Sequence, residues 1–351
     1  MLYQTENQHG GDIYGGGITL DFSANTNPLG TPPSVLAAIT QALPQLHRYP
    51  DPYCRALVKA IAEFHRIPES YILCGNGAAE LIYACCAAIK PQIAVEPAPA
   101  FAEYTLALAY MGSKVERYLL RQDSALDLDE NFPAFLEKVQ PELVFLCNPN
   151  NPTGRLISPA LLKRTLLYCR ETGTRLLLDE CFLDLSDDGV SMLAYLRDFP
   201  QLLILKAFTK SYGMAGVRLG YCLCADSALL EKMAGTSQPW NVSALAQAAG
   251  VAALRETEFL RQTRTLICTE RPWLAERLME LGFWGCPSKA NYLLLHGPEG
   301  LEEALRQQGI AIRNCANYHG LGDGWYRIAV RRHEENELLL AAIKQTLQRS
   351  V

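Results

Sequence analysis

The middle of the chain alternates short apolar runs with longer segments in which apolar residues recur every three or four positions. The short runs are typical of buried strands and the longer segments of amphipathic helices. We expect strands at residues 71–74, 93–96, 114–119, 143–147, 175–179, 202–207 and 220–224. We expect helices between them at residues 78–89, 101–111, 132–139, 159–171 and 191–197.

This alternation predicts an α/β fold with a mainly parallel, seven-stranded sheet that is covered by helices on both faces. Beyond residue 243 the pattern changes to helices at 244–255 and 258–281, a strand at 292–295, a helix at 301–308, a strand pair and a closing helix at 334–348. We therefore expect a large domain over residues 41–240 and a smaller α+β domain over 241–351. The Gly- and Pro-rich residues 1–40 should form an N-terminal arm that packs with the small domain.

Composition narrows the possible partners. The chain has 351 residues, of which 49% are hydrophobic and 20% charged, and its net charge is −5. A negative net charge argues against nucleic acid or an anionic membrane as a partner, and no segment reaches the ~20 apolar residues that span a bilayer. The first residues show neither the basic nor the apolar run of a secretory leader, so we expect a cytoplasmic protein.

The chain contains 12 cysteines, which in a small secreted protein would suggest disulfides. Here Cys85 and Cys86 are adjacent, and Cys222 and Cys224 are one residue apart within an expected strand. No pair has the CxxC spacing of a zinc site. We expect most of these cysteines to be buried, reduced thiols, and we expect no metal site.

The segment from Phe208 to Tyr221 combines Lys210 with small and hydroxylated neighbours, and Arg218 follows eight residues later. Apolar runs on both sides predict that Lys210 lies at a strand end, partly removed from water. A desolvated lysine amine can be neutral near pH 7, as it must be to react with an aldehyde cofactor. A lysine and an arginine that flank a turn are more often a solvated surface pair, so this assignment depends on the loops at neighbouring strand ends.

Three further loops follow expected strands. The run Gly75-Asn76-Gly77-Ala78-Ala79 opens a helix, and the N–H groups of a helix start can hold a phosphate, although such a turn alone is weak evidence. The run Asn148-Pro149-Asn150-Asn151-Pro152-Thr153-Gly154 forms a rigid turn that can present the amide of Asn151. Asp179 ends an apolar strand, where a carboxylate is costly unless it meets a cation.

These groups match the parts of pyridoxal 5′-phosphate (PLP). Lys210 would bind the aldehyde, Asp179 the protonated ring nitrogen and Asn151 the phenolic oxygen, while Thr209 and Arg218 would bind the phosphate with the glycine loop. For each group alone, a salt bridge, a helix cap or a rigid turn is a credible structural role. Their occurrence at successive strand ends, where ligands bind in such sheets, makes a PLP site the better interpretation.

The chain resembles the fold type I PLP enzymes of the aspartate aminotransferase superfamily, over essentially its full length. Within them it is most similar to the branch of histidinol-phosphate aminotransferases and threonine-phosphate decarboxylases. This resemblance implies that Lys210 is the Schiff-base lysine, that Asp179 pairs with the ring nitrogen and that Asn151 contacts the ring oxygen. The implied phosphate ligands are Gly77, Ala78, Ala79, Thr209 and Arg218. Phe101 would stack on the ring, and Tyr49 would reach the cofactor phosphate of the neighbouring subunit in a homodimer with shared active sites.

Features of the substrate side resemble the decarboxylases. They are the run His9-Gly10-Gly11, the run from Asp21 to Gly30, and Ile312-Arg313-Asn314-Cys315. The residues implied to hold the substrate are His9, Gly10, Asn25, Asn151, Arg313 and Arg327. A phosphorylated amino acid carries two anionic groups, so Arg313 and Arg327 could serve as two separate cationic clamps.

Residue 182 is Phe, whereas the aminotransferases typically have a tyrosine there, and Phe cannot donate a hydrogen bond to the ring oxygen. The resemblance thus implies a PLP-dependent decarboxylase that converts L-threonine O-3-phosphate to (R)-1-aminopropan-2-ol O-phosphate in cobalamin biosynthesis. Met214-Ala215-Gly216 is closer to the aminotransferase pattern, so an aminotransferase of histidinol phosphate or a related amino acid is the alternative. A non-catalytic PLP-binding regulator would usually add a DNA-binding segment, and this acidic chain shows none.

Overall fold

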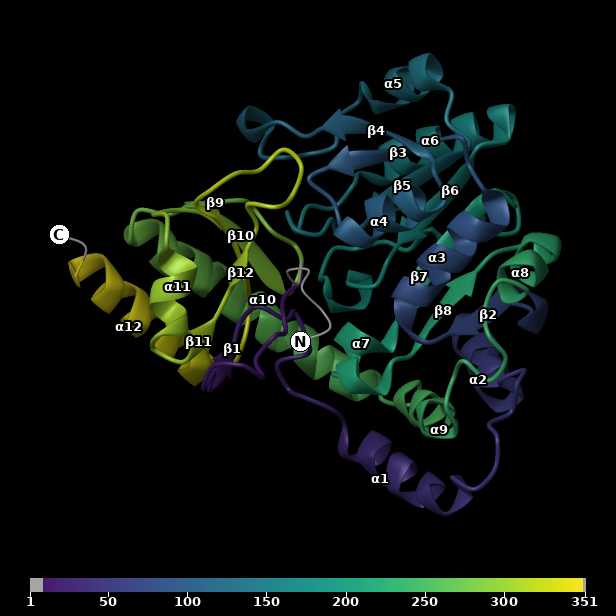
Figure 1. Ribbon diagram of the computed structural model, residues 1–351, viewed down its shortest axis with the longest axis horizontal. Coiled ribbons are helices and arrows are strands. Elements are labelled where there is room, and N and C mark those ends of the chain that lie inside the picture. Colours follow the sequence, from purple (N-terminus) through teal and green to yellow (C-terminus); the bar gives the residue numbers. More distant parts are fainter. Residues whose placement is uncertain (1–8, 350–351) are drawn as a thin grey trace.

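A seven-stranded sheet lies at the centre of the larger half of the molecule (Figure 1). The computed structural model describes residues 9–349. The strands are β2 (Ile72–Gly75), β3 (Ile93–Ala98), β4 (Lys114–Leu119), β5 (Leu143–Cys147), β6 (Arg175–Asp179), β7 (Leu202–Ala207) and β8 (Gly220–Leu223). Their order is β2-β8-β7-β6-β5-β3-β4, and only β8 runs antiparallel to its neighbours. The prediction of a mainly parallel, seven-stranded sheet is confirmed.

Helices cover both faces of this sheet. Successive side chains of a strand point to opposite faces, so Leu176 and Leu178 of β6 join one apolar core while Leu177 joins the other. The first core includes residues of α5 (Phe132–Val139) and α6 (Pro159–Thr172), and the second includes residues of α3 (Gly77–Ile89), α4 (Ala102–Tyr110) and α8 (Ser227–Ala234). Burial on both faces explains why the strands are nearly continuous apolar runs.

The other half of the molecule contains a four-stranded antiparallel sheet, in the order β12-β13-β10-β9. Its elements are β9 (Trp284–Gly285), β10 (Tyr292–His296), β12 (Arg313–Asn314), β13 (Trp325–Ala329), α10 (Thr257–Glu280), α11 (Leu301–Arg306) and α12 (His333–Arg349). β1 (Leu20–Asp21) pairs in parallel with β11 (Ile310–Ala311), and Phe22 joins the apolar core of this half. The N-terminal segment then continues away from the small sheet towards α1 (Figure 1).

Three helices longer than a single turn were not anticipated from the sequence: α1 (Pro33–Ala42), α2 (Arg55–His65) and α8. α1 and α2 both pack against α9 (Ala244–Ala253). Ala246, Ala249 and Ala253 of α9 belong to the core of the large sheet, although the sequence pattern grouped this helix with the C-terminal domain. The domain boundary at residue 240 stays a prediction.

The helix expected over residues 191–197 is wrong, because the structure has only a 3-10 helix at Met192–Tyr195. The backbone N–H of Met192 and the hydroxyl of Ser191 both donate to the carboxylate of Glu180. This attachment to a residue beyond the end of β6 fixes the start of the segment, which is too short to build a regular α-helix.

The cysteines are reduced thiols, as expected. Eleven of the 12 are buried and Cys268 is partly exposed. Burial raises the pKa of Cys147 and of Cys181 well above the ordinary thiol value, so both remain protonated beside the end of β6. Among residues 9–349, no helix combines the length and apolar character that crossing a membrane requires.

A buried ionic cluster supports the strand end that carries Asp179. Lys206 of β7 is 3% exposed, and its Nζ lies 2.7 Å from Oδ1 of Asp184 and 3.6 Å from Oε2 of Glu180. Glu180 is fully buried, and burial raises the pKa of its carboxyl group while the charge of Lys206 opposes that shift. Lys206 therefore compensates carboxylates that would otherwise be costly to bury.

Replacing Lys206 with Met tests this cluster. The substitution keeps most of the side-chain volume but leaves Glu180 and Asp184 without their buried cation, so we expect the free energy of unfolding to fall by about 3–5 kcal/mol. Urea denaturation followed by far-UV circular dichroism would measure the change. Lys138→Met, at an exposed position of α5, is the matched control and should change stability by less than about 0.5 kcal/mol. Equal stability of the two variants would contradict the argument.

Candidate active site

The loops at the carboxyl ends of the parallel strands meet in a cavity of about 400 Å³. The sheet topology predicts this location, because parallel strands end on one edge. Ala78 and Ala79 follow β2, Asn151 follows β5, and Lys210 follows β7. The cavity is lined by His9, Gly10, Ser23, Ala24, Asn25, Ala78, Ala79, Phe101, Glu103, Asn151, Asp179, Cys181, Phe182, Ala207, Thr209, Lys210, Arg218, Arg313, Tyr318 and Arg327.

Lys210 lies in α7 (Phe208–Ser211), a single helical turn directly after β7. Removal from water is the main cause that lowers the pKa of its amine, and the positive charges of Arg327 and Arg218 lower it further, to about 8. Its Nζ lies 5.7 Å from the centre of the Phe182 ring. A substantial fraction of the amine is therefore neutral near physiological pH, as a nucleophilic lysine requires.

One end of the cavity is built to receive a phosphate. Helix α3 begins at Gly77 without a side-chain cap, so the N–H groups of its first turn can serve an anion. Gly77 has a φ of +79°, and a Cβ at this position would lie 2.7 Å from Nη2 of Arg218. Only glycine allows the arginine to approach the helix start so closely. Thr209 and Arg218 also line the cavity, and their role as phosphate ligands stays a prediction.

The carboxylate of Asp179 is fixed in the floor of the cavity. It is 5% exposed, its Oδ2 accepts a hydrogen bond from the hydroxyl of Tyr104 at 2.7 Å, and its Oδ1 accepts one from the N–H of Cys181 at 2.9 Å. These two hydrogen bonds fix the orientation of the Asp179 carboxylate, which is the kind of group that can pair with a protonated pyridine nitrogen.

Asn151 and Phe101 lie where ring contacts were expected. Oδ1 of Asn151 accepts a hydrogen bond from Nη1 of Arg327 at 2.5 Å, and this contact orients the amide so that its NH2 group is the donor for a ring oxygen. Phe101 is the N-cap residue of α4, and its ring packs edge-on against Tyr104. With the helix start, Asp179 and Lys210, these residues fit PLP at each of its functional groups.

The substrate side of the cavity contains buried polar groups that the described residues do not satisfy. Asn25 is 1% exposed, and neither its Oδ1 nor its Nδ2 has a hydrogen-bond partner within residues 9–349. Nε of the buried Arg327 likewise has no partner there, although Nη2 donates to the carbonyl of Ser23 at 3.0 Å. Such groups cost free energy unless a ligand meets them.

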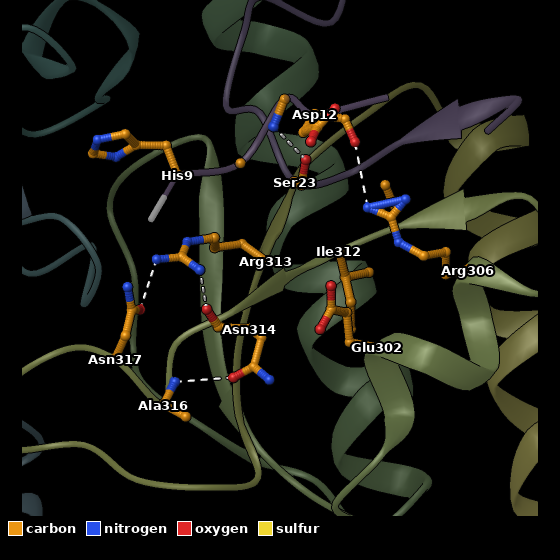
Figure 2. Close-up of a pocket in the computed structure, with 13 residues that line it drawn as sticks. His9, Asp12, Ser23, Glu302, Arg306, Ile312, Arg313, Asn314, Ala316 and Asn317 are labelled. Carbon is orange, nitrogen blue, oxygen red and sulfur yellow. Dashed lines mark hydrogen bonds between the residues drawn. The ribbon is translucent and has the colours of Figure 1, made fainter. Parts of the chain in front are cut away.

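Four residues of this cavity, His9, Gly10, Ser23 and Arg313, also line a second cavity of about 530 Å³ (Figure 2). The guanidinium group of Arg313 points towards Asn317, and its Nη2 donates to Oδ1 of Asn317 at 2.7 Å (Figure 2). Gly10 packs so closely on the backbone of Ser23 that a Cβ would lie 2.2 Å from the carbonyl oxygen. The residues predicted to hold the substrate all line the first cavity, namely His9, Gly10, Asn25, Asn151, Arg313 and Arg327.

Two of the predicted site residues, Gly77 and Tyr49, do not line the cavity. Gly77 directly precedes Ala78, which lines it. Tyr49 is 79% exposed, and its ring stacks on Trp240 with 4.5 Å between the ring centres. The structure also contains site residues that were not predicted, namely Ser23, Ala24, Glu103, Tyr104, Cys181 and Tyr318. The sequence held a signal for three of them. Ser23 and Ala24 lie inside the motif that identified Asn25. Tyr104 lies on a buried helix face, where a tyrosine needs a polar partner for its hydroxyl.

Comparison with known proteins places these features in a family. The family model for class I and II aminotransferases matches residues 18–343. The chain is 39% identical over 334 residues to the threonine-phosphate decarboxylase of Salmonella typhimurium, with 93% of this chain and 91% of that protein covered. It is 34% identical over 337 residues to histidinol-phosphate aminotransferase 2 of Ralstonia nicotianae, with coverages of 93% and 88%.

A solved structure agrees with these matches. The histidinol-phosphate aminotransferase from Clostridium acetobutylicum superimposes with a TM-score of 0.88 at 29% identity, covering 94% of this chain and 99% of that one. The relatives thus include decarboxylases and aminotransferases, which share a fold but break different bonds. We conclude that this chain belongs to the class I and II aminotransferase family, and that the PLP predicted from its loops is its cofactor.

Proposed function

We propose that the protein decarboxylates L-threonine O-3-phosphate to (R)-1-aminopropan-2-ol O-phosphate, a step of cobalamin biosynthesis. The observation that carries this proposal is the pair of cationic groups at the substrate side of one cavity. Arg327 lies at one position, and Arg313 with His9 at another. A substrate with both a carboxylate and a phosphate requires two such groups. The 39% identity to the Salmonella typhimurium threonine-phosphate decarboxylase supports the same reaction.

The residues of the chain divide the work as follows. Bound PLP would supply an electron sink for a bond that breaks at the substrate Cα. Asp179, oriented by Tyr104 and the Cys181 N–H, would pair with the ring nitrogen. Lys210 would hold the cofactor through its aldehyde group, and its Nζ would supply a proton at the substrate Cα.

The choice of bond would depend on the two clamps. Rotation of the bound substrate about its bond from nitrogen to Cα would select which bond at Cα breaks. Arg327 and the group of Arg313 and His9 would hold two anionic ends of the substrate and so fix this rotation. Loss of the carboxylate as CO2, with a proton in its place, gives the amine product.

An aminotransferase acting on histidinol phosphate or a related amino acid is the second candidate. The 34% identity to a histidinol-phosphate aminotransferase and the run Met214-Ala215-Gly216 favour it. The same lysine and the same clamps would serve that reaction if they held the substrate in the rotation that breaks the bond from Cα to hydrogen instead.

We further propose a homodimer with shared active sites. Tyr49 and Trp240 form an exposed aromatic pair, and exposed leucines at positions 43 and 46 precede them. In a dimer, Tyr49 would reach the cofactor phosphate of the other subunit, which accounts for its position outside the cavity of its own chain.

The reaction is tested by incubating the PLP-loaded protein with L-threonine O-3-phosphate without any oxo acid. We expect stoichiometric CO2 and an amine phosphate, because decarboxylation needs no amino acceptor. The matched incubation contains histidinol phosphate and 2-oxoglutarate. Absence of CO2 in the first, together with formation of glutamate in the second, would establish the aminotransferase instead.

The ionisation of Lys210 predicts a pH dependence for the apoprotein. The neutral amine attacks the aldehyde, so the rate of reaction with added PLP should rise with pH and reach half of its maximum near pH 8, because the pKa of Lys210 is lowered to about 8. An ordinary lysine would reach this point near pH 10.4. Stopped-flow absorbance between pH 6 and 10 measures the profile, and Lys210→Ala, which lacks the amine, should show no such phase.

The planar geometry of Arg327 is tested by Arg327→Lys. A lysine keeps the charge but cannot contact Asn151, Ser23 and a substrate carboxylate at once, so we expect kcat/KM to fall by about 10–100-fold. Steady-state kinetics, with whichever substrate the incubation experiment identifies, measures the loss. Arg332→Lys is the control, since Arg332 donates to the Pro28 carbonyl outside the cavity, and an equal loss there would contradict a specific role for Arg327.

A further inference from the structure

The N-terminal arm is attached to the cavity by one strong side-chain contact. Nε2 of His9 lies 2.6 Å from Oε1 of Glu103, and the contact joins residues 94 positions apart in the chain. Glu103 lies in the first turn of α4, two residues after Phe101, and its side chain is 15% exposed. The His9 ring also packs 5.7 Å from the Phe101 ring. The first residues of the arm that the structure describes are thus held beside the position expected for the cofactor ring.

Glu103 is an unusual residue for a cavity that receives anions. Of the described residues that line the cavity, only Glu103 and Asp179 carry carboxylates, whereas Lys210, Arg218, Arg313 and Arg327 are basic. A carboxylate in this position repels a phosphorylated substrate unless a cation compensates it. The hydrogen bond from His9 is the main cause that lowers the pKa of Glu103 below its ordinary value. Glu103 therefore stays ionised, and its charge is directed at His9.

This geometry gives His9 a defined chemical role. A carboxylate hydrogen-bonded to one imidazole nitrogen fixes the orientation of the ring. His9 and Arg313 both line the substrate side of the cavity, so Glu103 holds the His9 ring on the side where Arg313 is proposed to receive an anionic substrate group. Without Glu103, the ring could rotate and the arm would lose its attachment to α4.

We propose that Glu103 is a positioning residue which acts through His9. It docks the N-terminal arm on the cavity and makes the contribution of His9 to substrate binding specific for an anionic group on the substrate side chain. This inference rests on the proposed function, because it takes the substrate to be a phosphorylated amino acid.

Glu103→Gln in the PLP-loaded protein is the first test. Gln keeps the size and one acceptor oxygen but removes the charge. We expect the dissociation constant of L-threonine O-3-phosphate to rise on the order of tenfold, and that of unphosphorylated L-threonine to change less than about twofold. Both constants are measured from the visible absorbance of the cofactor on addition of the amino acid. A purely structural role would weaken both ligands alike, and that result would overturn the proposal.

The second test is a double-mutant cycle with His9→Gln. If Glu103 acts through His9, the double variant should bind L-threonine O-3-phosphate no more weakly than His9→Gln alone. Additive losses would show that Glu103 acts independently. Since His9 lies on the arm outside any helix, His9→Gln probes the contact without altering α4. Glu116→Gln is the matched control, because Glu116 pairs with Lys114 on β4, away from the cavity, and it should change neither constant.

Binding and turnover give separate answers. If the unmodified protein binds L-threonine O-3-phosphate but releases no CO2, the proposed reaction is wrong while the cycle still decides the role of Glu103. If CO2 is released and the phosphorylated and unphosphorylated ligands respond equally to Glu103→Gln, the reaction stands and the role proposed for Glu103 is wrong.

Discussion

To react with an aldehyde, the amine of Lys210 has to lose its proton close to neutral pH, and the surrounding structure lowers the pKa of this amine. Both removal from water and nearby positive charge penalise the ammonium form. The first effect comes from a sheet edge that helices and the N-terminal arm cover, and the second from Arg218 and Arg327. Arg218 follows Lys210 by only eight residues, whereas Arg327 belongs to β13 and meets Lys210 only because the larger and smaller halves of the molecule close on one cavity.

The distribution of satisfied and unsatisfied groups shows which ligands the cavity suits. Each of its carboxylates has a donor of its own: Tyr104 and a backbone N–H for Asp179, and His9 for Glu103. The groups without a partner within the described residues are the Asn25 amide and the Arg327 Nε. A cavity whose acids are compensated and whose donors remain available is complementary to anions, as PLP and a phosphorylated amino acid both are.

Relatives with two different reactions match this chain, and the proposed roles of the site residues account for this. Lysine, aspartate and phosphate cradle are common requirements of PLP chemistry at Cα, and they carry no information on which bond breaks. In the proposed mechanism that information lies in the rotation of the substrate, and hence in Arg327, Arg313 and the arm with His9. The contact between His9 and Glu103 is one place where the arm can influence specificity.

The sequence by itself determined the sheet and the four loops at its carboxyl edge. Strand periodicity, glycine turns and a carboxylate at a strand end are local patterns, and they can be read from residues that are close in sequence. Lys210, Asp179, Asn151, Arg218 and the glycine loop could therefore be placed in advance. α1 and α2, by contrast, acquire their role from packing against α9, a partner distant in the chain.

Only the tertiary structure decided which side chains hold the functional ones. Tyr104 reaches Asp179 across 75 positions and Glu103 reaches His9 across 94. No spacing rule links such pairs, because their distance depends on how whole helices and the arm pack on the sheet. The chemistry of the site was thus readable from local sequence, whereas its orientation and its charge balance are consequences of long-range packing.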